Sequence, residues 1–421
     1  MKIKIVGLFV CMLLLTTVLP TSATINVKIN VMSNFNDGTL SGYVKDSSMN
    51  PIEGALVRVY FHGTYEEDYT DSSGYYNVMN IPICWCMKNC TASKMGYNKE
   101  WVLLAIYENT THDFILSPSK ILFVGGGGPG NYSKIQDAID DAKDGDTVFV
   151  FDDSSPYYEN IIVKKSITIQ GENKYTTIID GANISHGVNI IADSVTVSGF
   201  TIQNCGDNGK PFKFISGILL SSNNNKIMDN IILQNRYGIS NINKLFLPPI
   251  NSDNTITNNQ IIHNYAGIYL VNVSNVNIIR NIISQNDEGI VLIGVINTNI
   301  SFNIISQNEG GIMIIYSYNA VIYRNNISYN NGGILAGVTS ADKILENNFI
   351  GNKRFSAVTV QRSAQIMYIM YLKLSLQVPI HRNIWNGNYW NKARSLPRII
   401  PEFLGLRFSV DWHPAKEPYD I

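Results

Sequence analysis

Charge of either sign is scarce in this sequence, and no long hydrophobic run follows its first 23 residues. The 421 residues include 32 Lys and Arg and 33 Asp and Glu, for a net charge of −1. Without a basic surface the chain cannot hold a phosphate backbone by charge, so we expect no nucleic-acid partner. Without an apolar run of about 20 residues in the remainder, we expect no transmembrane helix there.

Residues 1–23 predict an export signal. Lys2 and Lys4 precede an apolar run over residues 5–18, and Thr-Ser-Ala at residues 21–23 provides small residues for cleavage. We therefore expect an extracytoplasmic protein, secreted or at the cell surface. An uncleaved signal is the alternative, and it would be the chain's only contact with a membrane.

Cysteine is also rare, and its positions are uneven. Four of the five cysteines lie beyond the signal; Cys84, Cys86 and Cys90 are close together, and Cys205 stands apart. In an oxidising compartment a local disulfide is the favoured interpretation, for instance Cys84 or Cys86 with Cys90. The alternatives are free thiols and a soft-metal site with Cu(I) on two or three thiolates near Met87. We assign no metal site and no cofactor.

A repeat of 22 residues dominates the second half of the chain. Its recurring positions are a glycine, two isoleucines and two asparagines: Gly267, Gly289, Gly311, Gly333; Ile278, Ile300, Ile322, Ile344; Ile283, Ile305, Ile327, with Phe349 in the last unit; Asn281, Asn303, Asn325, Asn347; and Asn286, Asn308, Asn330, Asn352. Such a period, with apolar residues two apart, predicts a parallel β-helix with internal isoleucine columns and asparagine ladders. Asparagine also tolerates left-handed backbone, so we expect it at the corners.

Residues 38–118 predict a small β-sandwich from alternating strands and turns. Three segments, Gly42-Tyr-Val44-Lys-Asp46, Pro51-Ile-Glu-Gly54-Ala-Leu-Val57 and Thr70-Asp71 followed by Gly74-Tyr-Tyr76, resemble the carboxypeptidase regulatory-like domain, a transthyretin-like fold. The resemblance implies an accessory module on surface proteins. Its histidines, His62 and His112, have no neighbours spaced as metal ligands, so we expect them to face solvent.

A glycine-rich linker over residues 119–130 precedes a predicted capping helix from Ser133 through Ala142. The segments Asn131-Tyr-Ser-Lys-Ile135-Gln-Asp-Ala138-Ile139 and Ser166-Ile-Thr-Ile-Gln-Gly171 resemble the start of NosD-type proteins of the pectin-lyase-like superfamily. Archaeal surface proteins that join such a sandwich to such a β-helix are similar. The resemblance implies an all-β chain with a right-handed parallel β-helix over residues 131–380 and an aromatic-rich C-terminal cap over residues 381–421.

Candidate site residues are few. Asp287 and Glu309 occupy equivalent places in successive coils, so their carboxyls could approach about 5 Å, as in retaining glycosidases. They are weak catalytic candidates, because they lie next to a turn, where acidic residues are commonly just solvated. The 22-residue spacing breaks at residues 206–214 and 244–250, and inserted loops often carry function. Phe246, Trp385 and Trp390 are carbohydrate-binding candidates, although closing the end of the coil is the main interpretation of the tryptophans. The Asn204 coil fits a register shifted by one.

Asn-X-Ser/Thr sequons mark further candidates, for glycosylation of an exported chain. They are Asn89, Asn109, Asn131, Asn183, Asn272 and Asn299.

The sequence therefore predicts an exported, non-catalytic surface or envelope protein that binds polysaccharide or neighbouring surface components. The first alternative is a polysaccharide lyase or glycoside hydrolase. The second is a NosD-like copper-handling accessory protein, which would need clustered His, Met or Cys. In the repeat region His186 and His263 are not aligned with Met228 or Met313, so copper handling is the weaker of the two alternatives.

Overall fold

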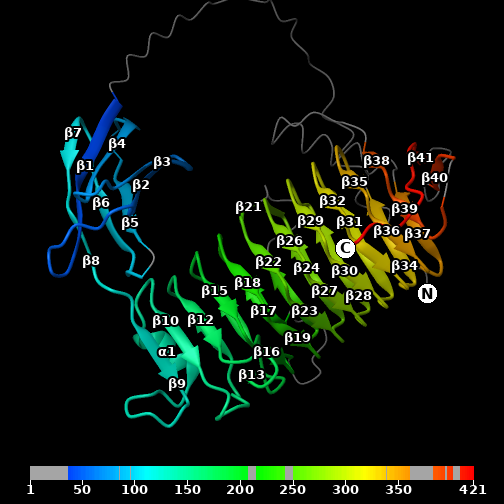
Figure 1. The fold of residues 1–421 in the computed structure, drawn as a ribbon, viewed down its shortest axis with the longest axis horizontal. Helices are drawn as coiled ribbons and strands as arrows, with labels where there is room; N and C mark the ends of the chain where they lie inside the picture. Colours follow the sequence, from blue (N-terminus) through cyan, green and yellow to red (C-terminus); the bar gives the residue numbers. More distant parts are fainter. Residues whose placement is uncertain are drawn as a thin grey trace, which may run out of the picture.

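The structure is a computed structural model that describes residues 37–421, apart from residues 85, 95, 207–214, 242–249, 338, 361–382, 394–395 and 402–407. The predicted export signal, both inserted loops for the most part, and Phe246 lie outside the described residues. A sandwich precedes a long stack of coils, which runs from green to orange in Figure 1. No helix in the described part is long and apolar enough to span a membrane.

The sandwich has two four-stranded sheets that enclose a single apolar core. One sheet has the order β4-β1-β7 with β8 also on β1, and the other has the order β3-β2-β5-β6. Their bounds are β1 (Asp37–Asp46), β2 (Leu56–Phe61), β3 (Thr64–Tyr69), β4 (Tyr75–Pro82), β5 (Lys88–Ser93), β6 (Glu100–Leu104), β7 (Asn109–Thr111) and β8 (Phe114–Leu116). Alternate residues point inward, so Leu40, Val44, Val57 and Val59 are fully buried.

The entrance to the coils is closed by a short helix, α1 (Ile135–Asp141). The predicted cap at Ser133 is wrong, because the N-cap residue is Lys134, whose side chain makes no capping bond. Instead the carboxylate of Glu159 accepts bonds from the amides of Ile135 and Gln136, at 2.9 and 3.0 Å. A carboxylate from the next coil thus satisfies the first free amides and suits the positive end of the helix.

The right-handed parallel β-helix is confirmed, and the coils contribute strands to three sheets, which are parallel except where β40 pairs antiparallel with β41 at the end of the long sheet. The long sheet runs through β9 (Ile121–Val124), β10 (Thr147–Val150), β12 (Thr168–Gly171), β15 (Thr196–Ser198), β18 (Lys226–Met228), β22 (Thr255–Thr257), β26 (Asn277–Ile279), β29 (Asn299–Ser301), β32 (Val321–Tyr323), β35 (Lys343–Leu345), β38 (Ile384–Asn386), β41 (Phe408–Asp411) and β40 (Arg398–Pro401). Because β9 pairs with β10, the expected linker 119–130 begins with a strand of this sheet.

The other two sheets have nine strands each. The second sheet contains β11 (Ile161–Val163), β14 (Val188–Ile190), β17 (Ser216–Leu220), β20 (Tyr237–Asn241), β24 (Ala266–Val271), β28 (Glu288–Ile293), β31 (Gly310–Ile315), β34 (Gly332–Gly337) and β37 (Phe355–Val360). The third sheet contains β13 (Ile178–Asp180), β16 (Thr201–Gln203), β19 (Ile231–Leu233), β23 (Gln260–Ile262), β27 (Ile282–Ser284), β30 (Ile304–Ser306), β33 (Asn326–Ser328), β36 (Asn348–Ile350) and β39 (Tyr389–Trp390). A small parallel pair, β21 (Ile250–Asn251) and β25 (Val273–Ser274), lies beside them.

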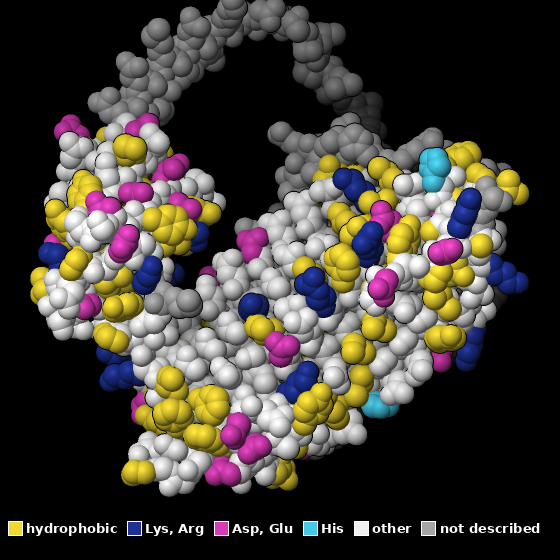
Figure 2. Space-filling model, in the orientation of Figure 1, with side chains coloured by type: hydrophobic (Ala, Val, Ile, Leu, Met, Phe, Trp, Pro, Cys, Tyr) yellow, Lys and Arg dark blue, Asp and Glu magenta, His cyan; other side chains and the backbone are white. Residues whose placement is uncertain are grey.

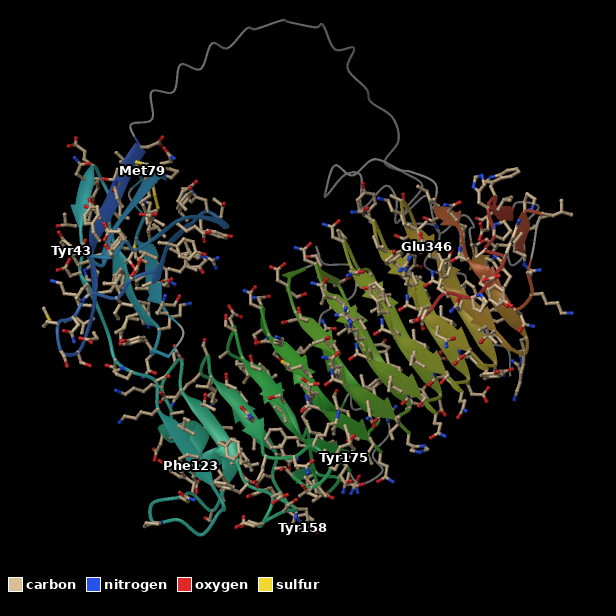
Figure 3. All side chains as sticks on the ribbon, viewed as in Figure 1. Tyr43, Met79, Phe123, Tyr158, Tyr175 and Glu346 are labelled. Carbon is tan, nitrogen blue, oxygen red and sulfur yellow. A yellow bond between two sulfur atoms is a disulfide. The ribbon has the colours of Figure 1, made fainter. Side chains whose placement is uncertain are left out.

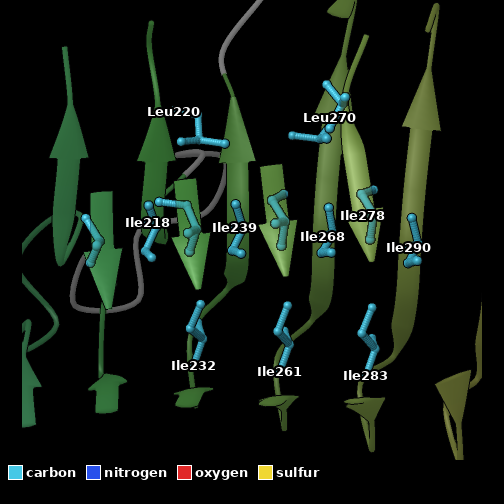
Figure 4. Close-up of a cluster of buried hydrophobic side chains, with 14 of the residues drawn as sticks. Ile218, Leu220, Ile232, Ile239, Ile261, Ile268, Leu270, Ile278, Ile283 and Ile290 are labelled. Carbon is cyan, nitrogen blue, oxygen red and sulfur yellow. The ribbon is translucent and has the colours of Figure 1, made fainter. Parts of the chain in front are cut away.

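Isoleucine columns fill the interior between the sheets. Ile278 pairs in register with Ile300 in the long sheet, and Ile283 with Ile305 in the third. Figure 4 shows such rows of inward side chains, one per coil. The register shift of one residue in the Asn204 coil is also present, since Ile202 pairs with Ile232. Cys205, rather than Asn204, therefore takes the first place of an asparagine ladder.

The asparagine ladders satisfy the backbone at the corners. The backbone amide and side-chain amide of Asn281 both donate to Asn303 Oδ1, at 2.9 and 3.0 Å. Asn281 Nδ2 also donates to the carbonyl of Ile256 at 2.9 Å. In the two asparagine ladders the left-handed residue is the one before the ladder asparagine: φ is 55° at Arg280 and 57° at Phe302. At the corner between the second and long sheets asparagines do take this backbone, with φ of 57° at Asn275 and 50° at Asn297. The ladder asparagines therefore serve through their two-sided amides.

The ladder ends on a carboxylate. Asp411 is fully buried, and its Oδ2 accepts bonds from the backbone and side-chain amides of Asn388, at 3.0 and 3.1 Å. Trp390 Nε1 donates to the same oxygen at 3.0 Å. The last member of the row has no further coil to donate to, so a group that only accepts fits it. Trp390 stacks on Phe349 with 4.5 Å between ring centroids and closes the apolar column.

At the corner between the second sheet and the long sheet, the side-chain acceptor is a buried acid, Asp342, instead of an asparagine amide. Asp342 is 1% exposed; its Oδ1 accepts from the Ala320 amide at 2.9 Å, and its Oδ2 accepts from the Ser317 hydroxyl. Burial raises the pKa of Asp342 to about 7, although both hydrogen bonds act in the opposite direction. The protonated form is therefore favoured in the folded chain at mildly acidic pH.

We expect Asn303→Ala to lower the free energy of unfolding by about 3 kcal/mol, because it removes the acceptor of the buried Asn281 amide and one of the donors to the Ile278 carbonyl. Chemical denaturation followed by circular dichroism measures this loss. Asn277→Ser, a half-buried position on β26, is the matched control and should change stability by less than about 1 kcal/mol. Equal losses in the two variants would contradict a special role for the ladder.

The pH dependence of stability should follow Asp342. Its folded pKa of about 7 lies above the ordinary 3.8, so its contribution is fully present below the unfolded pKa and is lost as pH rises through the folded one. Between about pH 4 and pH 9 this loss amounts to about 4 kcal/mol. Asp342→Asn keeps the acceptor without the charge, so its unfolding midpoint should exceed that of the wild type at high pH only. Parallel pH profiles would contradict the assignment.

Candidate functional site

Two adjoining depressions lie at the corner between the third and second sheets. Their volumes are about 270 and 520 Å³, and both are lined by Glu309 and Asn331. Asp287 and Glu309 do occupy equivalent places in successive coils, since the amide of Gly310 donates to the carbonyl of Asp287 at 2.8 Å. We call this surface the corner site; it comprises Gln285, Asp287, Glu288, Gln307, Glu309, Tyr329, Asn331, Lys353, Arg354 and Phe355.

Glycines create the hollow. Each coil leaves the asparagine ladder, exposes one polar residue, and then enters the second sheet at Glu288, Gly310 or Gly332. A Cβ at Gly310 would collide with Glu288 Oε2, and one at Gly332 would lie 2.6 Å from Phe355 Cζ. The Glu288 carboxylate and the Phe355 ring therefore occupy space that any larger residue would fill.

Three carboxylates share this corner. Glu288 is half-buried, and desolvation raises its pKa, with further contributions from the charges of Asp287 and Glu309. Glu309 Oε2 accepts a bond from Asn331 Nδ2 at 2.8 Å. Lys353 and Arg354 are exposed at the edge and bring positive charge. The arrangement places one acid with a raised pKa beside two exposed carboxylates.

Tyr329 supplies an aromatic surface to the same corner. Its side chain is 60% exposed, and it lines the larger depression. It holds the left-handed backbone place before Asn330, with φ of 58°. Its position in the coil is therefore fixed by the corner geometry.

Sequence reasoning found only part of this corner. It identified Asp287 and Glu309 but missed Glu288, Tyr329, Lys353 and Arg354. The sequence did contain a signal for Glu288. The equivalent residues of the next two coils are glycines, Gly310 and Gly332, and they leave space for the Glu288 side chain. The basic residues of the corner between the long and third sheets have separate partners: Arg280 lies over the Phe302 ring, and Arg324 Nε bonds Glu346 Oε2 at 2.8 Å. Glu346 is labelled in Figure 3.

The tryptophans are not a sugar platform. Trp385 and Trp390 are 3% and 4% exposed, so their proposed role in carbohydrate binding is wrong. They pair in register with Ile344 and Phe349 and continue the apolar columns. Figure 2 shows the charged side chains of this face scattered among hydrophobic and uncharged ones, without a large block of either sign.

The sandwich holds a second group of reactive side chains. Cys84 is bonded to Cys86, while Cys90 and Cys205 are buried free thiols; the pairing with Cys90 given as an example is not the one found. Burial raises the pKa of Cys90 to about 11 and that of Cys205 to about 12. His62 does face solvent, but its Nε2 lies 3.8 Å from Cys86 Sγ. Sequence spacing missed this neighbour, because it comes from another strand connection.

The sequons differ in exposure. Asn89, Asn109 and Asn183 are exposed, while Asn131 and Asn299 are half-buried. Asn272 is only 4% exposed. A glycan on Asn272 is therefore incompatible with the folded coil.

The described residues of the β-helix offer no clustered soft ligands for copper. His186 Nδ1 accepts a bond from the Ser216 amide at 3.1 Å, and desolvation lowers the pKa of His186. His263 is exposed on a separate coil. Within the described chain, the group of three side chains able to hold a metal ion is His62, Cys84 and Cys86, in the sandwich. The described part of the coils thus holds no cluster that fits a copper site.

Solved structures with similar folds come from several proteins. The Bacillus anthracis TIE protein is 14% identical, with a TM-score of 0.17 over 23% of this chain and 20% of its own. The enzymatically active domain of bacteriophage CBA120 tailspike protein 2 is 14% identical, with a TM-score of 0.42 over 65% of this chain and 47% of its own. The A-module of Azotobacter vinelandii mannuronan C-5 epimerase is 12% identical, with a TM-score of 0.34 over 62% and 82%. The chain spans less than half the length of the first two.

No curated protein matches the chain. Residues 158–395 match the family described as "Periplasmic copper-binding protein (NosD)". This segment covers more than half of the 421 residues and contains nearly all of the coils described above. The chain therefore belongs to the NosD family of β-helix proteins.

Proposed function

We propose that this protein binds an extracytoplasmic glycan at the corner site, without cleaving it. The observation that carries the proposal is the continuity of the two depressions, which share Glu309 and Asn331 and thus form one elongated surface across successive coils. Membership of a family described as periplasmic supports the compartment. Export by residues 1–23 stays a prediction.

The side chains of the corner suit a sugar. Carboxylate and amide groups of Asp287, Glu309 and Asn331 can accept from and donate to hydroxyl groups. The exposed ring of Tyr329 offers a flat apolar face for the C–H groups of a pyranose. Because equivalent residues recur at one strand spacing, about 4.8 Å, successive units of a polymer can meet similar groups.

The charge of the corner favours a neutral or amino-substituted glycan. Three carboxylates, Asp287, Glu288 and Glu309, face two cations, Lys353 and Arg354. A polymer with a carboxylate on every unit would place like charges against these acids, which costs binding free energy. Polyuronates are therefore disfavoured as ligands.

A screen against an array of neutral, amino and acidic glycans tests binding. We expect neutral or amino glycans to bind, and Asp287→Asn with Glu309→Gln to weaken that binding roughly ten-fold or more, because each lost charged hydrogen bond costs about 1.5 kcal/mol or more. Glu346→Gln is the matched control. It removes a carboxylate next to the ladder residue Asn347, outside the corner site, and should leave affinity unchanged. Binding confined to polyuronates, or insensitive to the double variant, contradicts the assignment.

Glycoside hydrolysis is the second candidate, and the raised pKa of Glu288 beside two further carboxylates favours it. A protonated Glu288 would be the acid, with Asp287 or Glu309 as its partner. The non-catalytic proposal expects no new reducing ends when a bound glycan is incubated with the chain.

Product analysis by mass spectrometry, with Glu288→Gln alongside, decides between the two. Cleavage by the wild type that disappears in Glu288→Gln would replace binding with hydrolysis as the function. Cleavage that persists equally in the variant would point to a contaminating enzyme and leave the chain a binding protein.

A further inference from the structure

We propose that His62, Cys84 and Cys86 bind one monovalent soft metal ion, Cu(I). The site becomes available when the Cys84–Cys86 disulfide is reduced. The site lies in the sandwich, outside residues 158–395 that match the family. It is independent of the glycan-binding proposal.

Strand register brings the three ligands together. β2 pairs antiparallel with β5, with Tyr60 opposite Asn89. Continuing this register past the end of β2 places His62, in the β2–β3 turn, opposite the residues that lead into β5. Cys84 and Cys86 lie in the connection that leads into β5, between Pro82 at the end of β4 and Lys88 at the start of β5. Residues more than twenty positions apart in sequence thus meet at one edge of the sheet.

The imidazole lies at a distance from the sulfurs that suits a metal ion, while the two sulfurs are bonded to each other and separate only on reduction. The donor atoms of the three residues lie within 4.8 Å of one another, and His62 Nε2 is 3.8 Å from Cys86 Sγ. An ion held roughly 2.0–2.3 Å from each nitrogen and sulfur places donors of a planar three-ligand site roughly 4 Å apart. His62 is exposed and both cysteines are half-buried, so an ion can enter from solvent.

Lys88 is the second observation that points to a bound charge. Its side chain is fully buried, and its ammonium group donates to Cys84 Sγ at 3.3 Å and to Cys86 Sγ at 3.8 Å. A buried cation aimed at two sulfurs is costly beside a neutral disulfide and favourable beside thiolates.

The charge balance selects a monovalent ion. Two thiolates and a neutral imidazole around Cu(I) carry a net charge of −1, which the Lys88 ammonium neutralises. The same ligands around Zn²⁺ are neutral and would leave the buried ammonium uncompensated. Thiolate ligands also prefer Cu(I) among common ions.

The disulfide makes binding conditional on redox state. A thiol reductant of low molecular mass supplies two electrons and two protons: its two thiols become a disulfide, and Cys84 and Cys86 become thiols. Binding of Cu(I) then releases the two thiol protons as the thiolates coordinate. Cys90 takes no part, because burial raises its pKa to about 11 and its thiol bonds the Lys88 carbonyl at 3.6 Å.

The full chain, reduced anaerobically and freed of reductant, should bind one Cu(I) at this site in competition with a chromophoric Cu(I) chelator. We expect copper–thiolate absorption in the ultraviolet from the reduced chain and none from the disulfide form. Cys84→Ser with Cys86→Ser should abolish this binding, and His62→Ala should weaken it roughly ten-fold. Cys90→Ala is the matched control and should retain it.

Selectivity tests the role of Lys88. Lys88→Met keeps the shape of the buried chain without its charge, so the preference for Cu(I) over Zn²⁺ should fall. Thermal unfolding of each variant verifies that the sandwich is folded. A reduced wild-type chain that binds no more Cu(I) than the double serine variant overturns the proposal, as does equal binding by the disulfide form or an unchanged preference in Lys88→Met.

Discussion

The rest of the structure depends on how this chain satisfies its backbone amides at the corners of a coil. Within a strand, the backbone pairs in register with the neighbouring coils, but at a corner the chain changes direction and the ladder of the sheet is interrupted. Asparagine resolves this because one oxygen accepts two bonds from the coil before it, while its nitrogen and backbone amide donate to the coil after it. Where the corners are satisfied, the isoleucine columns can pack without gaps.

Sequence alone was sufficient for the β-helix, because each coil repeats the same requirements and the repeat exposes them. Columns, ladders and even the one-residue shift at Cys205 could be predicted from spacing. The conformation of the corners could not: spacing identifies the asparagine, but only the three-dimensional path shows that Arg280 and Phe302 carry the left-handed backbone.

The candidate site was harder to predict, for a physical reason. Function in this chain depends on residues that depart from the repeat or meet across it. Glu288 matters because Gly310 and Gly332 follow it in the next coils, and His62 matters because strand pairing brings it to Cys86. At Trp385 and Trp390 the residue type suggested a site that is not there. A tryptophan can stack on a sugar or close the end of an apolar column, and only its burial in the structure distinguishes these two roles.

The ladder that ends on Asp411 also has a direction, and this affects how such a chain can change in length. In each rung the backbone amide and the side-chain amide donate to the side-chain oxygen of the next rung. The first residue of the row therefore needs no side-chain acceptor, and the last needs a side chain that only accepts. In this row Phe200 stands at the start, where its backbone amide donates to Asn230 Oδ1, and Asp411 stands at the finish. Duplication or loss of a 22-residue unit in the middle preserves both ends, because each rung presents the same two faces. A solenoid built in this way can therefore lengthen by internal duplication while its two ends remain unchanged.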